Sequence, residues 1–273
     1  MKFIYDAPAI FHKDALILGD THFGMERKLR NKGIYDEQFS ERLFLKLKEL
    51  ILKYKAKKVI FLGDVKEEIT MLDEKTRNIL SRLSLICEII IVRGNHDGGI
   101  ENCGCAKIIP SEGFVYCELG LAHGHSWPEE ELMKCKYIVL GHQHPMIGTK
   151  DSMGKIHKEP VWIVAEPEEK NISEHYKEYN TEIKLILMPA FNPLVGAVIK
   201  LTENNITKEA RKSFQKSKIK QSDTISNTKL KTGPLLNNKI FKLASALVLR
   251  LDGTRLGKLE KQVETYGKKT KRT

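Results

Sequence analysis

Short apolar runs that end in glycine or polar residues recur along the first half of the chain, and each predicts a buried strand. These runs cover residues 15–18, 59–62, 88–92, 119–122 and 137–140. Between the first three runs, apolar residues recur near the helical period of 3.6, which predicts helices over 37–54 and 72–85. The alternation of strands and helices predicts an α/β fold with a largely parallel central part.

The second half of the chain is richer in predicted strands, which lie at 161–165, 182–188, 195–201 and 246–251. A mixed α/β sandwich fits this order better than a symmetric doubly wound sheet. We expect four segments: a core over 1–202, a lysine-rich mobile insertion over 203–233, C-terminal strands that return to the core over 234–260, and a basic tail over 261–273. The insertion is either an inert loop or a segment that contacts nucleic acid.

Residues that commonly bind metal ions follow the predicted strands. Asp20 and His22 come after the first strand, and the alternation of side chains along an extended chain would point both the same way. Six of the nine histidines lie at or just beyond predicted strand ends: His22, His96, His123, His125, His142 and His144. Asp64 and Asn95 also follow strands, and open α/β sheets place their sites at the carboxyl ends of strands.

This mixture of carboxylate, imidazole and amide groups favours Mn²⁺, Fe or Zn²⁺ over a metal that selects thiolates. Two such ions about 3.5–4 Å apart would acidify a shared water and neutralise a phosphate, so the pattern predicts phosphoester hydrolysis by in-line attack. Cys103-Gly104-Cys105 could also suggest a metal or redox site, but no second cysteine pair lies at zinc-site spacing. We interpret the five cysteines as structural or incidental thiols.

The strand-end residues form five ordered motifs: Gly19-Asp20-Thr21-His22, Gly63-Asp64, Gly94-Asn95-His96-Asp97, His123-Gly124-His125 and Gly141-His142-Gln143-His144. In this order they resemble the calcineurin-like metallophosphoesterase superfamily. Phe23-Gly24, the stretch 27–33 and Pro145 are similar to the ICC-like branch, which includes the DNA-ligase-associated endonuclease-like proteins of prokaryotes. The stretches 188–193 and 252–254 are similar to archaeal members.

The resemblance implies a metallophosphoesterase-type mixed β-sandwich flanked by helices, with a dinuclear metal site at the carboxyl ends of the strands. It implies two divalent ions, Mn²⁺ first, with Fe, Zn or Ni as alternatives. The implied ligands are Asp20, His22 and His144 for the first ion, Asp64 as the bridge, and Asn95, His123 and His142 for the second. His125 competes with His123, which we prefer because it ends the strand directly. His96 would protonate the leaving oxygen or stabilise the transition state.

The second motif departs from the protein phosphatases of this superfamily, which have Gly-Asp-x-x-Asp-Arg-Gly there. Glu67 keeps a carboxylate at the orienting position, but Glu68 replaces the phosphate-binding arginine, which argues against a phosphoprotein substrate. We expect Glu67, or failing that Asp97, to orient His96. The candidate substrate-binding residues are Arg27, Arg30, Arg93 and His125, although solvated loop charges would explain the arginines equally well.

The net charge of +11 favours an anionic partner, although a generally basic surface would have the same charge. We therefore expect a phosphodiesterase that acts on nucleic acid, either DNA or RNA. The alternatives are a phosphodiesterase or phosphomonoesterase of small nucleotides or metabolites, and a non-catalytic scaffold of the same fold. Neither a signal peptide nor an apolar run of membrane-spanning length is evident, so we expect a cytoplasmic protein without membrane contact.

Overall fold

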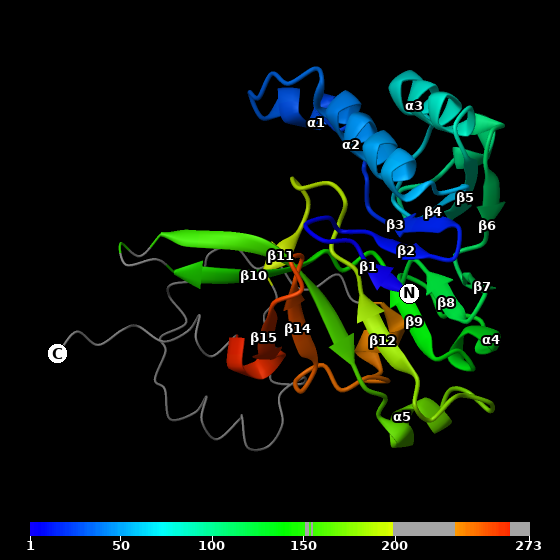
Figure 1. Cartoon of the computed structure of the whole chain (residues 1–273), viewed down its shortest axis with the longest axis vertical. Helices are drawn as coiled ribbons and strands as arrows, with labels where there is room; N and C mark the ends of the chain where they lie inside the picture. Colours follow the sequence, from blue (N-terminus) through cyan, green and yellow to red (C-terminus); the bar gives the residue numbers. More distant parts are fainter. Residues whose placement is uncertain (151–152, 154, 199–232, 263–273) are drawn as a thin grey trace.

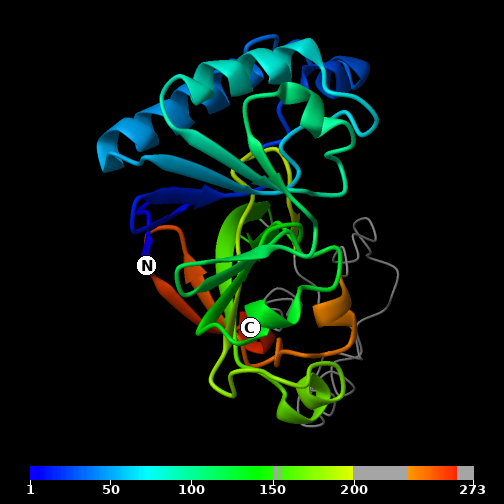
Figure 2. The same ribbon diagram turned by 90° about the vertical axis from the view of Figure 1, so that its right-hand side faces the viewer.

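The computed structural model describes residues 1–150, 153, 155–198 and 233–262. In this part of the chain two β-sheets lie face to face, and helices cover their outer faces (Figures 1 and 2). The core between the sheets is made of apolar side chains from both, including Ile17, Ile60, Leu121, Val139 and Trp162. The predicted mixed α/β sandwich is therefore confirmed. None of the described helices is long and apolar enough to cross a membrane.

The first sheet has six strands in sequential order, and its last four strands are parallel. The strands are β1 Lys2–Phe3, β2 Ile10–His12, β3 Ala15–Leu18, β4 Lys58–Leu62, β5 Glu88–Val92 and β6 Lys107–Ile109. Two long helices, α2 (Phe39–Tyr54) and α3 (Glu74–Ser84), bury their apolar faces against its outer side. The shorter helices are α1 (Glu26–Asn31) and a 3₁₀ turn, η1 (Ile100–Cys103).

The second sheet has nine strands among the described residues, and it is mixed. Its strands are β7 Phe114–Tyr116, β8 Leu119–Ala122, β9 Tyr137–Leu140, β10 Pro145–Lys150, β11 Ile156–Ala165, β12 Lys184–Leu187, β13 Ala197–Val198, β14 Leu247–Arg250 and β15 Arg255–Lys258. Its outer apolar face packs against three short helices: α4 Glu130–Met133, α5 Glu169–Ser173 and α7 Pro234–Asn237.

Helix α3 shows how local sequence sets the boundaries. The Asp73 carboxylate accepts a hydrogen bond from the Thr76 amide at 2.9 Å, so the helix begins at Glu74 rather than at residue 72. Such a side-chain cap satisfies a backbone donor that the first turn leaves free. The predicted helix over 72–85 is confirmed with this small shift at its start. The helix predicted over 37–54 is likewise found as α2.

The predicted strands are confirmed wherever an apolar run marks them. Strand β11 begins at Ile156, five residues before the predicted start at 161. Its first half pairs with β10 and is polar, so no apolar run marks it in the sequence. The predicted C-terminal hairpin is present as antiparallel β14 and β15. Strands β1, β2, β6 and β7 are missing from the prediction because two or three residues are too few to show a period, and the six-residue strand β10 is missing because PMIGTK is not a continuous apolar run.

Two predictions reach beyond the described part of the chain. The lysine-rich insertion expected over 203–233 lies outside the described residues except for Gly233, and so does the basic tail expected over 261–273 beyond Gln262. The strand expected over 195–201 is present only as β13, since residues 199–201 are not described.

Candidate metal centre

The metal-compatible residues lie just beyond the carboxyl ends of five strands. Strands β3, β4 and β5 are parallel neighbours in the first sheet, and β8 and β9 are parallel neighbours in the second. Their ends therefore meet at one edge of the sandwich. The residues that follow these strand ends are Asp20, His22, Asp64, Asn95, His96, His123, His142 and His144.

The backbone at this edge is left-handed at five of these positions. The φ angles are 58° at Asp20, 44° at His22, 49° at Asp64, 63° at His142 and 44° at His144. Such angles are uncommon outside glycine and persist where surrounding structure holds them, often at functional sites. Asp20 and His22 do converge as predicted, but the reason differs, because they lie on a turn beyond β3 and not on an extended strand.

Two glycines let the strand ends approach closely. A Cβ atom on Gly63 would lie 2.3 Å from Nδ1 of His123, and one on Gly94 would lie 2.2 Å from the Asp64 amide nitrogen. Both distances are far below van der Waals contact, so any larger residue would push these turns apart. Glycine at these two positions therefore allows the turns of the second and third motifs to lie close together.

The first group of ligand atoms belongs to Asp20, His22, Asp64 and His144, and these atoms all lie within 4.8 Å of one another. Nε2 of His144 lies 2.9 Å from Oδ1 of Asp20, and Nε2 of His22 lies 3.7 Å from Oδ2 of Asp64. All four side chains are buried. Oδ2 of Asp64 and Nε2 of His22 have no hydrogen-bond partner in the described structure, so this space suits a cation.

The second group comprises Asp64, His123 and His142. Nε2 of His123 lies 3.4 Å from Oδ1 of Asp64, 3.3 Å from Oδ1 of Asn95 and 3.1 Å from Nδ1 of His142. Nδ1 of His123 lies 2.6 Å from the Leu62 carbonyl oxygen, which only accepts hydrogen bonds. Nδ1 therefore carries a proton, and Nε2 faces the other ligand atoms.

The buried carboxylates and imidazoles shift one another's pKa values. Burial alone would raise the pKa of Asp64, but His123 and His22 hold it well below its usual range. Burial lowers the pKa of His123, but the hydrogen bond and charge of Asp64 outweigh this effect and raise that pKa to about 9. Ionised carboxylates at this depth need positive charge close by, which protons or bound cations can supply.

Glu67 contacts His96 through its main chain, and the predicted role of its carboxylate in orienting that ring stays a prediction. Nδ1 of His96 lies 3.2 Å from the main-chain carbonyl oxygen of Glu67, whereas the Glu67 carboxylate lies 2.9 Å from Nδ1 of His22. The Asp97 carboxylate accepts hydrogen bonds from the amides of Val65 and Gly94 instead. Neither carboxylate contacts His96, because the second-motif loop turns its backbone, and not its side chain, toward that ring.

The Glu67 carboxylate instead lies between the side chains of Lys28 and His22. Its Oε1 lies 2.5 Å from Nζ of Lys28, while its other oxygen faces His22. Burial would raise the pKa of Glu67, but His22 and Lys28 lower it to about 2. The sequence does not show this contact of Lys28 with Glu67, since the two residues follow different motifs and only the fold brings them together.

Two further supporting residues were not predicted as part of the site. The fully buried Lys66 donates from Nζ to the carbonyl oxygens of Ile69 at 3.1 Å and His96 at 2.6 Å, so it holds the loop that carries His96. Asn192 is also fully buried, and its Nδ2 donates to the Thr21 carbonyl at 3.0 Å.

His125 lies beside the second group rather than in it. Its ring centroid is 5.2 Å from that of His123 and 6.0 Å from that of His142. Burial and the neighbouring His123 lower the pKa of His125. Of the two competing histidines, the structure places His123 against Asp64 and leaves His125 half-buried at the rim.

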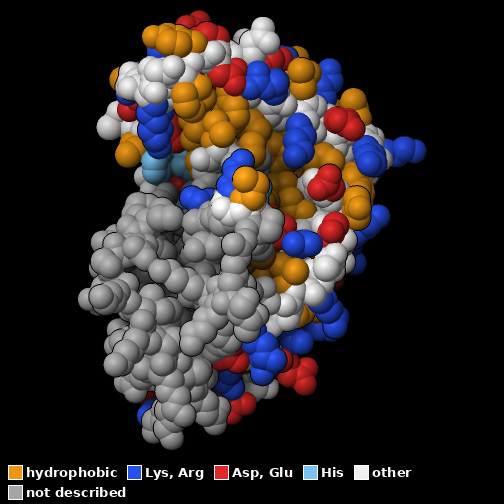
Figure 3. All heavy atoms as spheres, turned by 90° about the vertical axis from the view of Figure 1, so that its left-hand side faces the viewer, with side chains coloured by type: hydrophobic (Ala, Val, Ile, Leu, Met, Phe, Trp, Pro, Cys, Tyr) orange, Lys and Arg blue, Asp and Glu red, His pale blue; other side chains and the backbone are white. Residues whose placement is uncertain are grey.

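The predicted substrate-binding arginines are paired with carboxylates at the surface. Arg27 contacts Glu68 and Arg30 contacts Glu37, each at 2.5 Å, and Arg93 contacts Glu101. Asn95 is exposed and His96 half-buried, so the centre is open to solvent on one side. Figure 3 shows histidine side chains reaching the surface on this face, with Lys or Arg side chains nearby.

An α/β sandwich with buried carboxylates and imidazoles at its strand ends defines a class of metal-dependent hydrolases. Residues 14–125, which contain the first four motifs, match the family model of the calcineurin-like phosphoesterases. This segment, which is less than half of the chain, is thus similar to the calcineurin-like phosphoesterases, and the buried carboxylates and imidazoles of the centre are compatible with a metal site.

Two solved structures have a similar fold. The nuclease MPE of Pseudomonas putida is 19% identical, with 72% of this chain and 84% of that chain covered and a TM-score of 0.48. YfcE, a phosphoesterase from E. coli, is 16% identical, with 65% and 79% covered and a TM-score of 0.37. No curated protein matches the chain.

Proposed function

We propose that the chain hydrolyses phosphodiester bonds with two divalent metal ions, and that Asp64 lies between them. The supporting observation is that the two oxygens of Asp64 face different ligand groups. Oδ2 lies 3.7 Å from Nε2 of His22, and Oδ1 lies 3.4 Å from Nε2 of His123. One carboxylate can span the separation of about 3.5–4 Å that is typical of two-metal sites.

The remaining ligands divide between the two sides of Asp64. Asp20 and His144 belong with His22, and His142 and Asn95 belong with His123. Two cations held there would lower the pKa of a water molecule and neutralise charge on the phosphate. Oxygen and nitrogen ligands without sulfur suit Mn²⁺ first, with Fe, Zn or Ni as alternatives.

The ring nitrogens that would face the cations are fixed by contacts behind them. Glu67 lies behind His22, and the Leu62 carbonyl lies behind His123. Such outer contacts set the tautomer and the orientation of a metal-binding imidazole. In this proposal the Glu67 carboxylate positions His22, while the Glu67 main-chain carbonyl positions His96.

His96 is the proposed proton donor to the leaving oxygen. The Glu67 carbonyl oxygen, 3.2 Å from Nδ1 of His96, can only accept, so Nδ1 carries a proton and Nε2 is the nitrogen left for the substrate. The ring is half-buried at the open side of the centre, where a bound ester would lie. A protonated Nε2 would then pass its proton to the departing oxygen.

Nucleic acid is the proposed substrate because the chain carries a net charge of +11. One observation favours the competing proposal of a small phosphoester. Arg27, Arg30 and Arg93 are all paired with carboxylates, so a polynucleotide would have to displace those partners.

The proposed compartment is the cytoplasm. All five cysteines are free thiols, which supports a reducing compartment.

The test is a comparison of esters with the metal-supplemented protein. We expect Mn²⁺-dependent turnover of an activated phosphodiester, with single-stranded or duplex DNA or RNA also cleaved, and none of these activities in Asp64→Asn. Turnover of the small diester alone would favour the small-ester enzyme. Metal binding without turnover of any ester would contradict the proposal. Nucleic-acid binding should also weaken steeply as salt rises.

A further inference from the structure

A second group of metal-ligand side chains lies where the two sheets meet, at the end of the strands opposite to the metal centre. His12 ends β2 and pairs with Ala15, the first residue of β3, whereas Asp20 lies beyond the other end of β3. Cys117 and Glu118 form the two-residue turn before β8, whereas His123 lies beyond its other end. One ligand atom from each of His12, Cys117 and Glu118 lies within 4.8 Å of the others.

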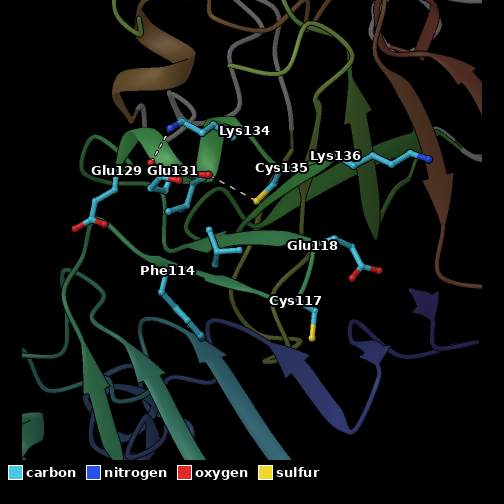
Figure 4. Close-up of a pocket in the computed structure, with 10 residues that line it drawn as sticks. Phe114, Cys117, Glu118, Glu129, Glu131, Lys134, Cys135 and Lys136 are labelled. Carbon is cyan, nitrogen blue, oxygen red and sulfur yellow. Dashed lines mark hydrogen bonds and ion pairs between the residues drawn. The ribbon is translucent and has the colours of Figure 1, made fainter. Parts of the chain in front are cut away.

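Figure 4 shows how the turn is placed. The side chains of Cys117 and Glu118 project from the end of the β7–β8 hairpin, next to the first strands of the chain, drawn in blue. The neighbouring Tyr116 hydroxyl donates a hydrogen bond to the Asp14 carboxylate, which fastens the hairpin to the first sheet. The three ligand-type residues thus come from both sheets and are held in place by a contact that does not involve them.

His12 is the observation that points to a ligand. Its side chain is only 3% exposed, and neither ring nitrogen has a hydrogen-bond partner in the described structure. Buried polar atoms are nearly always paired, so two unpaired nitrogens on one buried ring need an explanation.

The distance between His12 and Glu118 fits a shared cation better than a direct bond. Nε2 of His12 lies 3.5 Å from Oε1 of Glu118, which is long for a hydrogen bond. Two ligand atoms that each lie about 2.1 Å from a tetrahedral zinc ion are separated by about 3.4 Å. The pair is therefore already spaced as two ligands of one ion.

Cys117 supplies the group that selects the metal. It is a free, exposed thiol with a φ angle of 55°, at the first position of a tight turn where glycine is favoured. A thiolate, an imidazole and a carboxylate together match Zn²⁺, which accepts sulfur, nitrogen and oxygen ligands.

We propose that His12, Cys117 and Glu118 bind one Zn²⁺ ion that links the two sheets, with water as the fourth ligand. This edge site, defined by these three residues, does not depend on the proposed phosphodiesterase activity. It shares no residue with the metal centre and lies at the opposite ends of β3 and β8.

Cobalt spectroscopy separates the two sites, because the metal centre contains no cysteine. Co²⁺ bound to a thiolate gives a charge-transfer absorption in the near ultraviolet, which imidazole and carboxylate ligands do not give. The full-length protein, freed of metal and titrated with Co²⁺, should show this band growing until the edge site is filled, at no more than about three equivalents in total because the centre takes up two, and added Zn²⁺ should abolish it. Cys117→Ser should lose the band completely, and His12→Gln should lose it or bind Co²⁺ at least about tenfold more weakly.

The matched control is Cys103→Ser, which removes a thiol from the other candidate pair and should keep the band. Because Cys117 is exposed in a turn, its serine variant should fold, and circular dichroism checks this. If wild-type protein shows no thiolate band, or if Cys117→Ser keeps it, the edge site does not exist. A lost ester-hydrolysing activity with an intact band would instead count against the metal centre alone.

Discussion

The metal centre and the edge site use similar ligands but hold them differently. At the centre, five residues beyond strands β3, β4 and β9 have a left-handed backbone: Asp20, His22, Asp64, His142 and His144. At the edge, His12 ends a strand, and only Cys117 has a left-handed backbone. A left-handed backbone costs free energy at residues other than glycine, so the surrounding structure must hold these ligands in place.

The two regions also differ in what lies behind the ligands. His22 has Glu67 behind it, and His123 has the Leu62 carbonyl, so both rings are oriented before a metal ion arrives. His12 has no such contact in the described structure. Catalysis needs ligands held close to their working geometry, whereas a structural ion can order its own ligands. We therefore expect substitutions at the centre to change rates and substitutions at the edge to change metal content.

The largest expected effect is that of Asp64→Asn. The change removes the charge that faces both ligand groups, so the proposed bridge is lost. The metal ions would then no longer contribute their several kcal/mol of transition-state stabilisation. We expect kcat for an activated phosphodiester to fall by about 10³-fold or more at saturating Mn²⁺. A thermal unfolding curve is the control for folding. Near-normal turnover would show that Asp64 is not the bridge.

Replacing His96 should cost less and leave metal binding unchanged. His96→Gln removes the proposed proton donor but none of the proposed ligands, so kcat should fall by about 10²-fold. Isothermal titration with Mn²⁺ should give the affinity of the wild-type protein. A parallel loss of metal affinity would instead make His96 a ligand, together with its neighbours His22 and Glu67.

The fold and the position of the centre were predictable because both depend on local patterns. Apolar runs marked the strands, and the polar residues after β3, β4, β5, β8 and β9 marked the edge where they meet. Parallel neighbours place their ends together, so a local feature repeated five times implied one shared site. The convergence of Asp20 and His22 was predicted from the alternation of side chains along an extended chain, although the backbone that produces it is a turn.

Contacts between distant segments could not be predicted in the same way. The sequence shows that Glu67 follows the second motif, but only the folded loop shows that its carboxylate faces His22 and its carbonyl faces His96. The edge site is a stronger case, because His12 and Cys117 are brought together solely by the packing of one sheet on the other. No spacing in the sequence records that packing.

Glu67→Gln should have a smaller effect, which appears in metal affinity. The neutral amide no longer holds the Nδ1 proton of His22 as strongly, and loss of such an outer contact typically weakens metal binding about 10–100-fold. At saturating Mn²⁺, kcat should recover most of its value. Glu68→Gln is the matched control, since Glu68 pairs with the exposed Arg27, and it should behave as wild type. Equal effects in both variants would show that Glu67 does not position His22 for metal binding.

The smallest effect on activity is expected for Cys117→Ser, whose turnover should stay within about twofold of wild type. Its effect should appear in stability instead. An ion that binds only the folded state at a concentration of 100 times its Kd contributes about 2.7 kcal/mol, which for a domain of this size raises Tm by roughly 5 °C or more. Wild type and Cys117→Ser share the metal centre, so the difference between their Zn²⁺-induced Tm shifts reports the edge site. Equal shifts would leave the edge site without a stabilising role, because its ion would then not hold the two sheets together.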